Sequence, residues 1–302
     1  MTLSERFERE ARGEIVTHPL PWGYLDYLTY CLRPGTVTVI AGPTGVGKSY
    51  LLMETDIFLH RRGVDTCYLP LEDDRIDWER RALCIMDGSF SHNMMDQDRA
   101  PARMEAYARH EQELKDVMSR VSENPRMIKN FDYKVDHKFV EEWCEASSRV
   151  SKVVFIDPYA QIEVDGAKPW ELESKFARRM CAIAKKHEIA VVLAMHTKCR
   201  PGKSSDMPLT VDDIQGSTNL CRLFHSVLIL NQYGEDKSGE VALYGGGVTK
   251  AVWNASMYIA KARNSSGIRK SVAFNFKGIP TFEEVGLIIP KNKASKKKNG
   301  NE

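Results

Sequence analysis

Eight consecutive residues near the start of the chain have the composition of a phosphate-binding loop. They match the pattern GxxxxGK(S/T) at every fixed position and are Gly42, Pro43, Thr44, Gly45, Val46, Gly47, Lys48 and Ser49. Glycines let successive backbone N–H groups converge on phosphate oxygens, and a helix that begins behind them adds its positive end. Lys48 would reach the β- and γ-phosphates, and the Ser49 hydroxyl would bind Mg²⁺. The segment predicts a nucleoside triphosphate site.

Hydrolysis of a bound nucleotide needs carboxylates as well. Asp157 ends an apolar run, and an acid placed there beside a phosphate loop holds Mg²⁺ and its waters. Glu72 follows the apolar run 67–71 and would orient a water toward the γ-phosphate. Its neighbours Asp73 and Asp74 compete for that role, and an exposed acidic turn is the alternative interpretation.

A histidine stands at a comparable position. His196 ends the apolar run 191–196, which we expect to lie beside the run that ends at Asp157. Ligands bind at the carboxyl edge of open α/β sheets, so a neutral imidazole there could sense the γ-phosphate. A purely structural histidine is the alternative.

The segments that would position these residues follow an alternating pattern. Short runs rich in β-branched residues alternate with segments of helical period, which is typical of an α/β fold with a mainly parallel sheet. We expect strands over residues 37–41, 66–71, 153–157, 190–194 and 226–231. We expect helices over 49–62, 77–86 and 171–187, and a largely exposed helical insertion over 103–122. Two later runs, 255–261 and 271–276, predict an antiparallel extension.

The charge of the chain is unevenly distributed. The 302 residues include 43 Lys and Arg against 41 Asp and Glu, a net charge of +2. The segment 291–302 holds five lysines and one glutamate, which leaves a net charge of −2 for the remainder. A uniformly basic surface that binds nucleic acid is therefore excluded, and any such contact must be local. The content of 42% hydrophobic and 28% charged residues is that of a globular chain.

The remaining composition predicts a cytoplasmic protein with no membrane partner. None of the seven cysteines is spaced as a CxxC pair, so we expect reduced and mostly buried thiols. No apolar run approaches the ~20 residues of a membrane span. The first ten residues, MTLSERFERE, are too charged for a signal peptide.

Taken together, the motifs resemble the RecA-like ATPases, specifically the hexameric replicative DNA helicases of the DnaB family and their compact plasmid relatives of the RepA type. The matching residues are Pro34 and Gly35, the phosphate loop, 68–73 (YLPLED), 155–158 (FIDP), 195–197 (MHT) and 259–264 (IAKARN). The resemblance covers roughly residues 20–285. It implies a RecA-like P-loop NTPase core whose cofactors are ATP and Mg²⁺.

The resemblance also assigns roles to two cations. In that family a lysine and an arginine cross a subunit boundary and contact the γ-phosphate bound by the neighbour, and Lys261 and Arg263 match them. An arginine supplied in this way contributes about 10³–10⁵ in rate and makes hydrolysis depend on assembly. A homo-oligomer, as a hexameric ring, is therefore implied. A basic strand end is the alternative interpretation of these residues.

Two loops of the family line the ring's central channel and bind single-stranded DNA. The first corresponds to residues 161–170, where Lys168 and Trp170 suit phosphate and base contacts and the acids Glu163 and Asp165 oppose them. The second corresponds to 198–216, a polar stretch broken by Pro and Gly. Its expected DNA contacts are Lys198, Arg200 and Lys203, together with Gly216 and Ser217 directly after it. A solvated loop is the alternative.

The resemblance has limits that affect domain organisation. We expect residues 1–20 to be an N-terminal arm and a candidate subunit-contact segment, 21–286 the ATPase domain, and 287–302 a disordered tail rich in lysine. The DnaB family carries an N-terminal helical collar that does not fit into 1–20, and it usually has Gln where His196 stands, so the plasmid type is the better comparison. A helicase loader and a primase are possible partners. A RecA-type recombination ATPase and a regulatory or helicase-accessory NTPase remain alternatives.

Overall fold

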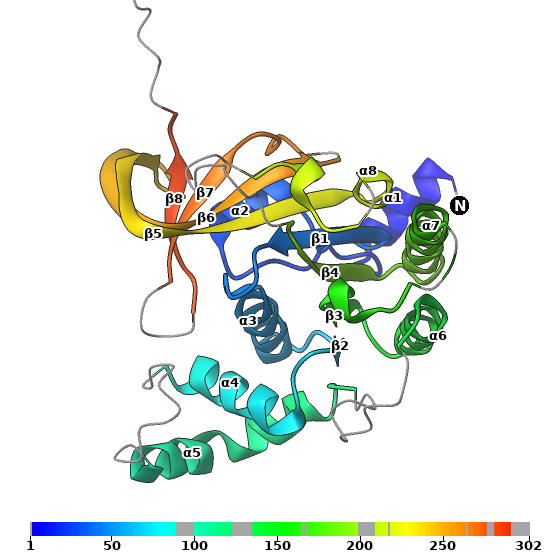
Figure 1. Cartoon of the computed structure of the whole chain (residues 1–302), viewed down its shortest axis with the longest axis horizontal. Helices are drawn as coiled ribbons and strands as arrows, with labels where there is room; N and C mark the ends of the chain where they lie inside the picture. The colour runs from blue at the N-terminus through cyan, green and yellow to red at the C-terminus, as the bar shows by residue number, and fades with distance from the viewer. Residues whose placement is uncertain are drawn as a thin grey trace, which may run out of the picture.

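The computed structural model describes residues 2–88, 100–122, 135–164, 166, 168–198, 209–216, 218–263, 265–276 and 281–290. These residues form one eight-stranded sheet with helices on both faces (Figure 1). The order of the strands is β2-β3-β4-β1-β5-β6-β7-β8. Their bounds are β1 Thr36–Gly42, β2 Thr66–Pro70, β3 Val153–Asp157, β4 Ala190–His196, β5 Ser226–Ala242, β6 Val248–Ala262, β7 Ser271–Asn275 and β8 Glu283–Ile288.

The first five strands are parallel neighbours, and the remaining pairs are antiparallel. Strands β1 to β4 are buried almost throughout, as expected of parallel strands covered on both faces. The register pairs Gly42 with His196 and Pro70 with Asp157. The carboxyl ends of four strands therefore meet at one edge, which is where the sequence places its candidate residues. The predicted mainly parallel α/β fold is confirmed.

Helices on the two faces complete two hydrophobic clusters. One cluster includes residues of α2 Gly23–Thr29, α3 Lys48–Arg61, α4 Arg75–Asp87 and α5 Ala100–Met118. The other includes residues of α6 His137–Ser147, α7 Pro169–His187 and α8 Thr218–Leu223. Asp74 and Asp136 accept backbone hydrogen bonds as N-caps of α4 and α6, which fixes where these helices begin. None of the described helices is both long and apolar enough to cross a membrane.

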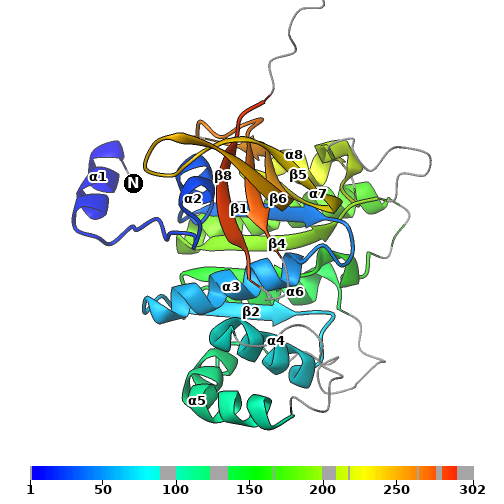
Figure 2. The same cartoon turned by 90° about the vertical axis from the view of Figure 1, so that its left-hand side faces the viewer.

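The predicted helical insertion is α5, which begins three residues earlier than expected. Most of its side chains are exposed, as its polar composition indicated. Three small or aliphatic residues, Ala106, Leu114 and Val117, are nevertheless buried. They fasten α5 onto the body beside α4 (Figure 2).

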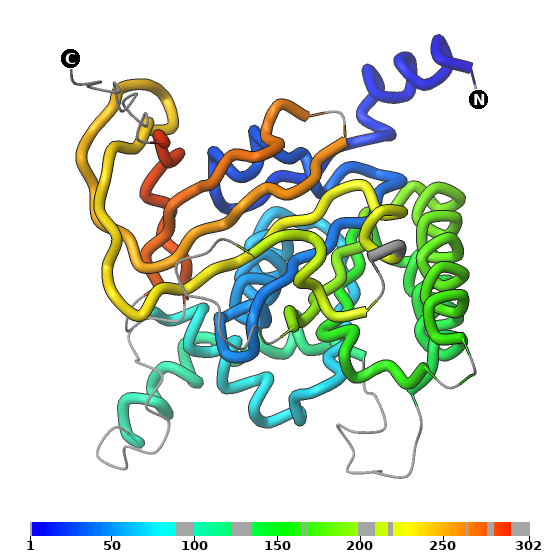
Figure 3. The backbone as a smooth tube through the Cα atoms, turned by 45° about the horizontal axis from the view of Figure 1, so that its top comes forward, coloured from blue at the N-terminus to red at the C-terminus, as the bar shows by residue number. Residues whose placement is uncertain are grey.

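The antiparallel part is larger than the sequence indicated. Strand β5 continues eleven residues beyond the predicted end at 231, and β6 begins seven residues before the predicted start at 255. The unpredicted strand β8 pairs with β7 and also with the end of β5, through Val241 and Ile288. Strands β5 to β8 thus close on themselves, as Figure 3 shows, around Val241, Trp253 and Ala273.

The N-terminal arm contains an unpredicted helix, α1 Leu3–Ala11, which stands apart from the body (Figure 2). Thr2 and Glu5 form a capping box at its start, a sequence signal that could have revealed it. None of its residues is buried. Arg9 fastens it to the end of α7 by donating to both carboxylate oxygens of Glu188, at 2.8 and 2.6 Å.

A buried acid on α3 predicts a measurable pH dependence of stability. Asp56 is fully buried, and neither of its carboxylate oxygens has a hydrogen-bond partner among the described residues. Burial raises its pKa from 3.8 to about 6, against the opposing effects of the Thr66 hydroxyl and Arg120. Because the folded-state pKa is the higher one, stability is lost as pH rises from about 4 through 6.

Replacing Asp56 by asparagine should therefore stabilise the protein above pH 7, by about 3 kcal/mol for a pKa shift of about two units. The gain should vanish near pH 4, where the carboxyl is protonated in both states. Thermal unfolding at pH 4 and pH 8 measures the difference. Asp65→Asn is the matched control, because that exposed carboxylate lies 3.8 Å from the same Arg120. An equal gain at both pH values would contradict the assignment.

Candidate nucleotide-binding site

The phosphate loop joins β1, which ends at Gly42, to α3, which begins at Lys48. Gly47 has φ +95°, in the left-handed region, and a Cβ there would lie 3.0 Å from Phe282 and 3.1 Å from Phe276. A Cβ at Gly42 would lie 2.7 Å from the carbonyl oxygen of Leu230. Glycine is thus required at both positions, and the turn leaves the N-terminus of α3 open toward a ligand.

A cavity of about 350 Å³ adjoins this loop. Thirteen residues from five segments line it: Thr44, Gly45, Gly47, Lys48, Ser49, Tyr50, Glu72, Asp73, Arg81, Asp157, Pro158, His196 and Phe276. The structure therefore brings together the phosphate loop, Glu72, Asp157 and His196, which lie far apart in the sequence.

Lys48 lines this cavity and is buried. Its Nζ donates to the carbonyl oxygens of Gly42, at 3.0 Å, and Pro43, at 2.7 Å. Burial lowers its pKa to about 8, while Asp157 and Glu72 act in the opposite direction. Lys48 thus remains charged at pH 7 with only neutral groups as hydrogen-bond acceptors, the two carbonyls and the His196 ring, and the negative oxygens of a phosphate would be stronger acceptors.

Asp157 and Ser49 fit a magnesium ion. Asp157 is buried, and its Oδ2 accepts a hydrogen bond from the Tyr68 hydroxyl at 2.7 Å. Its Oδ1 is also buried and has no hydrogen-bond partner among the described residues. Burial raises the pKa of Asp157, and the hydroxyls of Tyr68 and Ser49 and the charge of Lys48 oppose that rise. An unpaired carboxylate oxygen near a serine hydroxyl suits a hard cation that keeps several waters.

No set of three or more His, Cys, Asp or Glu side chains that could hold a metal occurs in the described ranges. At phosphate sites Mg²⁺ is usually bound through one or two protein groups, waters and the phosphates themselves.

The three competing acids after β2 differ in their surroundings. Asp74 caps α4 by accepting from the backbone N–H of Asp77 at 2.8 Å. Asp73 accepts from Arg81 Nη1 at 2.6 Å. Glu72 is exposed in the cavity, has no hydrogen bond within the described part of the chain, and acts electrostatically on Lys48 and His196. Glu72 is thus the acid whose carboxylate is available to a bound water.

The imidazole of His196 lies close to two side chains of the phosphate loop. Its Nδ1 is 3.2 Å from Thr44 Oγ1 and 3.3 Å from Lys48 Nζ. Burial and then the charge of Lys48 lower its pKa, so the imidazole is neutral at pH 7. A neutral ring beside a protonated lysine accepts at Nδ1 and carries its proton on Nε2. That Nε2–H is a donor that a phosphate oxygen could use.

Lys261 and Arg263 lie away from this cavity, at the end of β6. Lys261 Nζ donates to the carbonyl oxygens of Cys221, at 3.3 Å, and Arg222, at 2.5 Å. Arg263 Nη2 donates to the same Arg222 oxygen at 3.2 Å. Burial, and then the charge of Arg263, lower the pKa of Lys261 to about 8.

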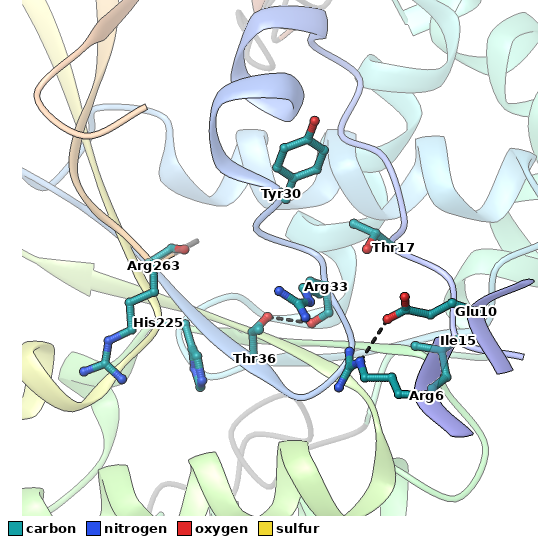
Figure 4. Close-up of a pocket in the computed structure, with 10 residues that line it drawn as sticks. Arg6, Glu10, Ile15, Thr17, Tyr30, Arg33, Thr36, His225 and Arg263 are labelled. Atoms are coloured by element: carbon teal, nitrogen blue, oxygen red, sulfur yellow. Dashed lines mark hydrogen bonds and ion pairs between the residues drawn. The ribbon is translucent and has the colours of Figure 1, made fainter. Parts of the chain in front are cut away.

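Arg263 also lines a second cavity of about 400 Å³, shown in Figure 4. Thr36 and Ser226, the first residues of β1 and β5, line it too, so it opens at the edge opposite the phosphate loop. His225 in its wall has a pKa lowered to about 4, by burial and by Arg263, Lys185, Lys261 and Arg33. Three arginines, Arg6, Arg33 and Arg263, line this cavity against one acid, Glu10, so the cavity is electropositive.

The predicted DNA-binding residues are only partly described. Lys168 is exposed at the start of α7, where it pairs with Glu171 at 2.9 Å. Lys198 is exposed two residues after the end of β4, and Gly216 has φ +98° two residues before α8. Arg200, Lys203 and Ser217 lie outside the described residues, as does Asp165. Contact with DNA stays a prediction for all of them.

Sequence reasoning missed three lining residues, Tyr50, Arg81 and Phe276. Arg81 lies inside helix α4 and belongs to no short motif. Arg81 lies with its guanidinium 5.6 Å from the ring centre of Tyr50 while it pairs with Asp73. The packing of α4 brings the Arg81 side chain to the cavity.

The sequence matches no known family model, and it has no significant match among curated proteins. Solved structures are similar in fold. A DnaB-like replicative helicase, described with its interactions with primase, has TM-score 0.68 at 15% identity, with 93% of this chain and 65% of that chain covered. A structure of an ATPase domain has TM-score 0.69 at 16% identity, with 93% of this chain and 96% of that domain covered.

A KaiC-like protein from the hyperthermophilic archaeon Pyrococcus horikoshii OT3 is also similar, with TM-score 0.52 at 14% identity, covering 91% of this chain and all of that one. At such identities the likeness shows the fold. The chain has the RecA-like fold of DnaB-like helicases, as its motifs predicted. It spans about two thirds of the DnaB-like chain, 65% of its length.

Proposed function

We propose that this protein is a Mg²⁺- and ATP-dependent DNA helicase of the ring-forming type. The observation that carries the proposal is the separation of its charged groups. Lys48, Glu72, Asp157 and His196 share one cavity at the carboxyl edge of the sheet, whereas Arg263 lines a cavity at the opposite edge. A single chain can bind the nucleotide but cannot bring Arg263 to it, so the complete site requires a second copy.

The proposed reaction uses each side chain for one task. Backbone N–H groups of the loop and Lys48 bind the triphosphate, and Glu72 orients the attacking water. Ser49 and Asp157 would hold a magnesium ion, which would supply positive charge beside the phosphates. His196 would donate from Nε2 to the γ-phosphate and so register its presence. Arg263 of a neighbouring copy would stabilise the charge that develops on the transferred phosphoryl group, with Lys261 beside it.

Charge complementarity supports assembly through these two edges. The nucleotide cavity is lined by the acids Glu72, Asp73 and Asp157, and the cavity that Arg263 lines holds three arginines against one glutamate. A head-to-tail contact between the two would repeat around a ring, for which we propose six subunits.

Helix α1 would extend the same contact. Leu3 is 67% exposed and Phe7 is 59% exposed, and their spacing of four residues puts them on one side of the helix. We propose that this side packs on the neighbouring subunit.

Assembly into a ring would allow a chain without a broadly basic surface to bind DNA. With a net charge of −2 outside the tail, a single chain has no broadly basic surface. Several copies that each place Lys168, Lys198 and the rest of the 198–216 loop on one axis would multiply the local field. We propose single-stranded DNA as the bound polymer, with a loader and a primase as candidate partners.

The likeness to a KaiC-like protein favours one alternative, a regulatory or accessory ATPase without unwinding activity. A RecA-type recombination ATPase is the other. Strand displacement on a forked duplex separates them, because only the helicase should open the fork with ATP. Electron microscopy with an ATP analogue and single-stranded DNA tests the ring. If the protein hydrolyses ATP but neither opens the forked duplex nor forms closed rings, the proposal is contradicted.

Replacing Glu72 by glutamine should lower ATP turnover by about 10²–10⁴-fold, because the amide orients water poorly and cannot take its proton. Nucleotide binding should persist, since Lys48 and the loop remain. Phosphate release and binding of a fluorescent ATP analogue measure the two effects. Asp74→Asn is the matched control, because asparagine caps a helix as well as aspartate does. A larger loss in Asp73→Asn than in Glu72→Gln would assign the role to Asp73.

A further inference from the structure

The two cations proposed to act on a neighbour's ATP are both held by the last turn of α8. Lys261 donates to two backbone carbonyl oxygens there, and Arg263 donates to one of them. The last carbonyls of a helix lack intrahelical partners and form its negative end, which attracts cations. A neutral carbonyl is nevertheless a weaker acceptor than a phosphate oxygen. The arrangement holds both side chains reversibly.

Helix α8 also follows the proposed DNA-binding loop directly. At the base of that loop the Lys198 N–H donates to Asp213 O at 2.6 Å, and the Gln215 N–H donates to His196 O at 2.8 Å. Gly216 then leads into α8, and a Cβ there would lie 3.2 Å from Glu173 Oε1. The loop end is thus closely confined between β4 and α7.

Two lysines act electrostatically on the same residue of α8. Lys198 from the loop base and Lys261 from β6 both lie near enough to Cys221 of α8 to act on its thiol. Leu220 and Cys221 are buried in the cluster that includes α7. Helix α8 has six residues, so a displacement of its first turn must move its last carbonyls as well.

We propose that α8 is a positioning element that couples DNA bound at the loop base to the placement of Lys261 and Arg263. The inference rests on the proposed function and adds a route of regulation to it. Phosphates of a single strand bound at Lys198 and Gly216 would pull on the start of α8. The carbonyls of Cys221 and Arg222 would then move away from the two cations, which become available to the γ-phosphate in the neighbouring subunit.

Truncating the anchor of α8 tests this coupling. Leu220→Ala should loosen α8 and release both cations without DNA, so the ratio of DNA-stimulated to basal ATP turnover should fall several-fold. Leu114→Ala on α5 is the matched control, because it removes the same buried atoms far from α8 and should keep the wild-type ratio. An unchanged ratio in Leu220→Ala would overturn the proposal, as would an equal fall in both variants.

A measurement on the unmodified protein avoids any folding defect. Acetylation of Lys261 by a lysine reagent, followed by mass spectrometry without nucleotide, should become several-fold faster when oligo-dT saturates the protein. Labelling of the exposed Lys115 should not change. If fluorescence anisotropy shows bound oligo-dT but Lys261 labelling is unchanged or slower, the coupling is wrong and the helicase proposal stands. If oligo-dT does not bind, both proposals fall.

Discussion

Replacing Lys48 by alanine should lower ATP hydrolysis by about 10²–10³-fold, the loss typical when one preorganised charge is removed from a phosphoryl-transfer site. Strand displacement should disappear with it. Among the described residues that line the nucleotide cavity, Lys48 is the one lysine, and its ammonium group already donates to weak acceptors. Phosphate release and displacement on a forked duplex measure the two losses.

A folding defect must be separated from this effect. Removing Lys48 leaves the buried Gly42 carbonyl and the partly buried Pro43 carbonyl without the lysine donor, which costs stability in its own right. Thermal unfolding of Lys48→Ala should therefore accompany the activity assay. Lys115→Ala is the matched control, since that exposed lysine pairs only with Glu111 on its own helix. Wild-type turnover in folded Lys48→Ala would show that hydrolysis occurs elsewhere.

The parts of the site that the sequence predicts are those whose geometry is local. The phosphate loop depends on a few glycines between a strand and a helix, so its pattern alone defines it. Asp157 and His196 end buried strands, and parallel strands carry such ends to one edge. For the same reason the five parallel strands lie close to where they were expected.

Other features depend on contacts that a sequence pattern does not contain. Glu72, Asp73 and Asp74 are adjacent acids, and only a helix cap and the ion pair with Arg81 distinguish their roles. The sequence did not predict the long β5–β6 hairpin, because residues 232–242 are polar and rich in turn formers. It also did not predict β8, which pairs with the end of β5. Pairing with distant strands decides such segments, not their own propensity.

Mixing two inactive variants should restore ATP turnover. Arg263→Ala alone should lose about 10³–10⁵-fold, the contribution of an arginine supplied in trans. Lys48→Ala alone should be inactive as well. In a ring assembled from equal amounts of both, about a quarter of the interfaces combine an intact Lys48 with an intact neighbouring Arg263. Turnover should therefore recover to about a quarter of wild type if the interfaces act independently.

The distribution of charges makes this result diagnostic. Arg263 and the phosphate loop lie at opposite edges of the same sheet, so no side-chain rotation within one chain can join them. Arg222→Ala is the matched control, because Arg222 contacts Arg263 through its backbone carbonyl and its own exposed side chain has no role in the proposal. It should keep wild-type turnover. If mixtures that are shown to co-assemble do not recover turnover, Arg263 does not act across the interface. The proposal that ATP hydrolysis requires a ring would then be contradicted.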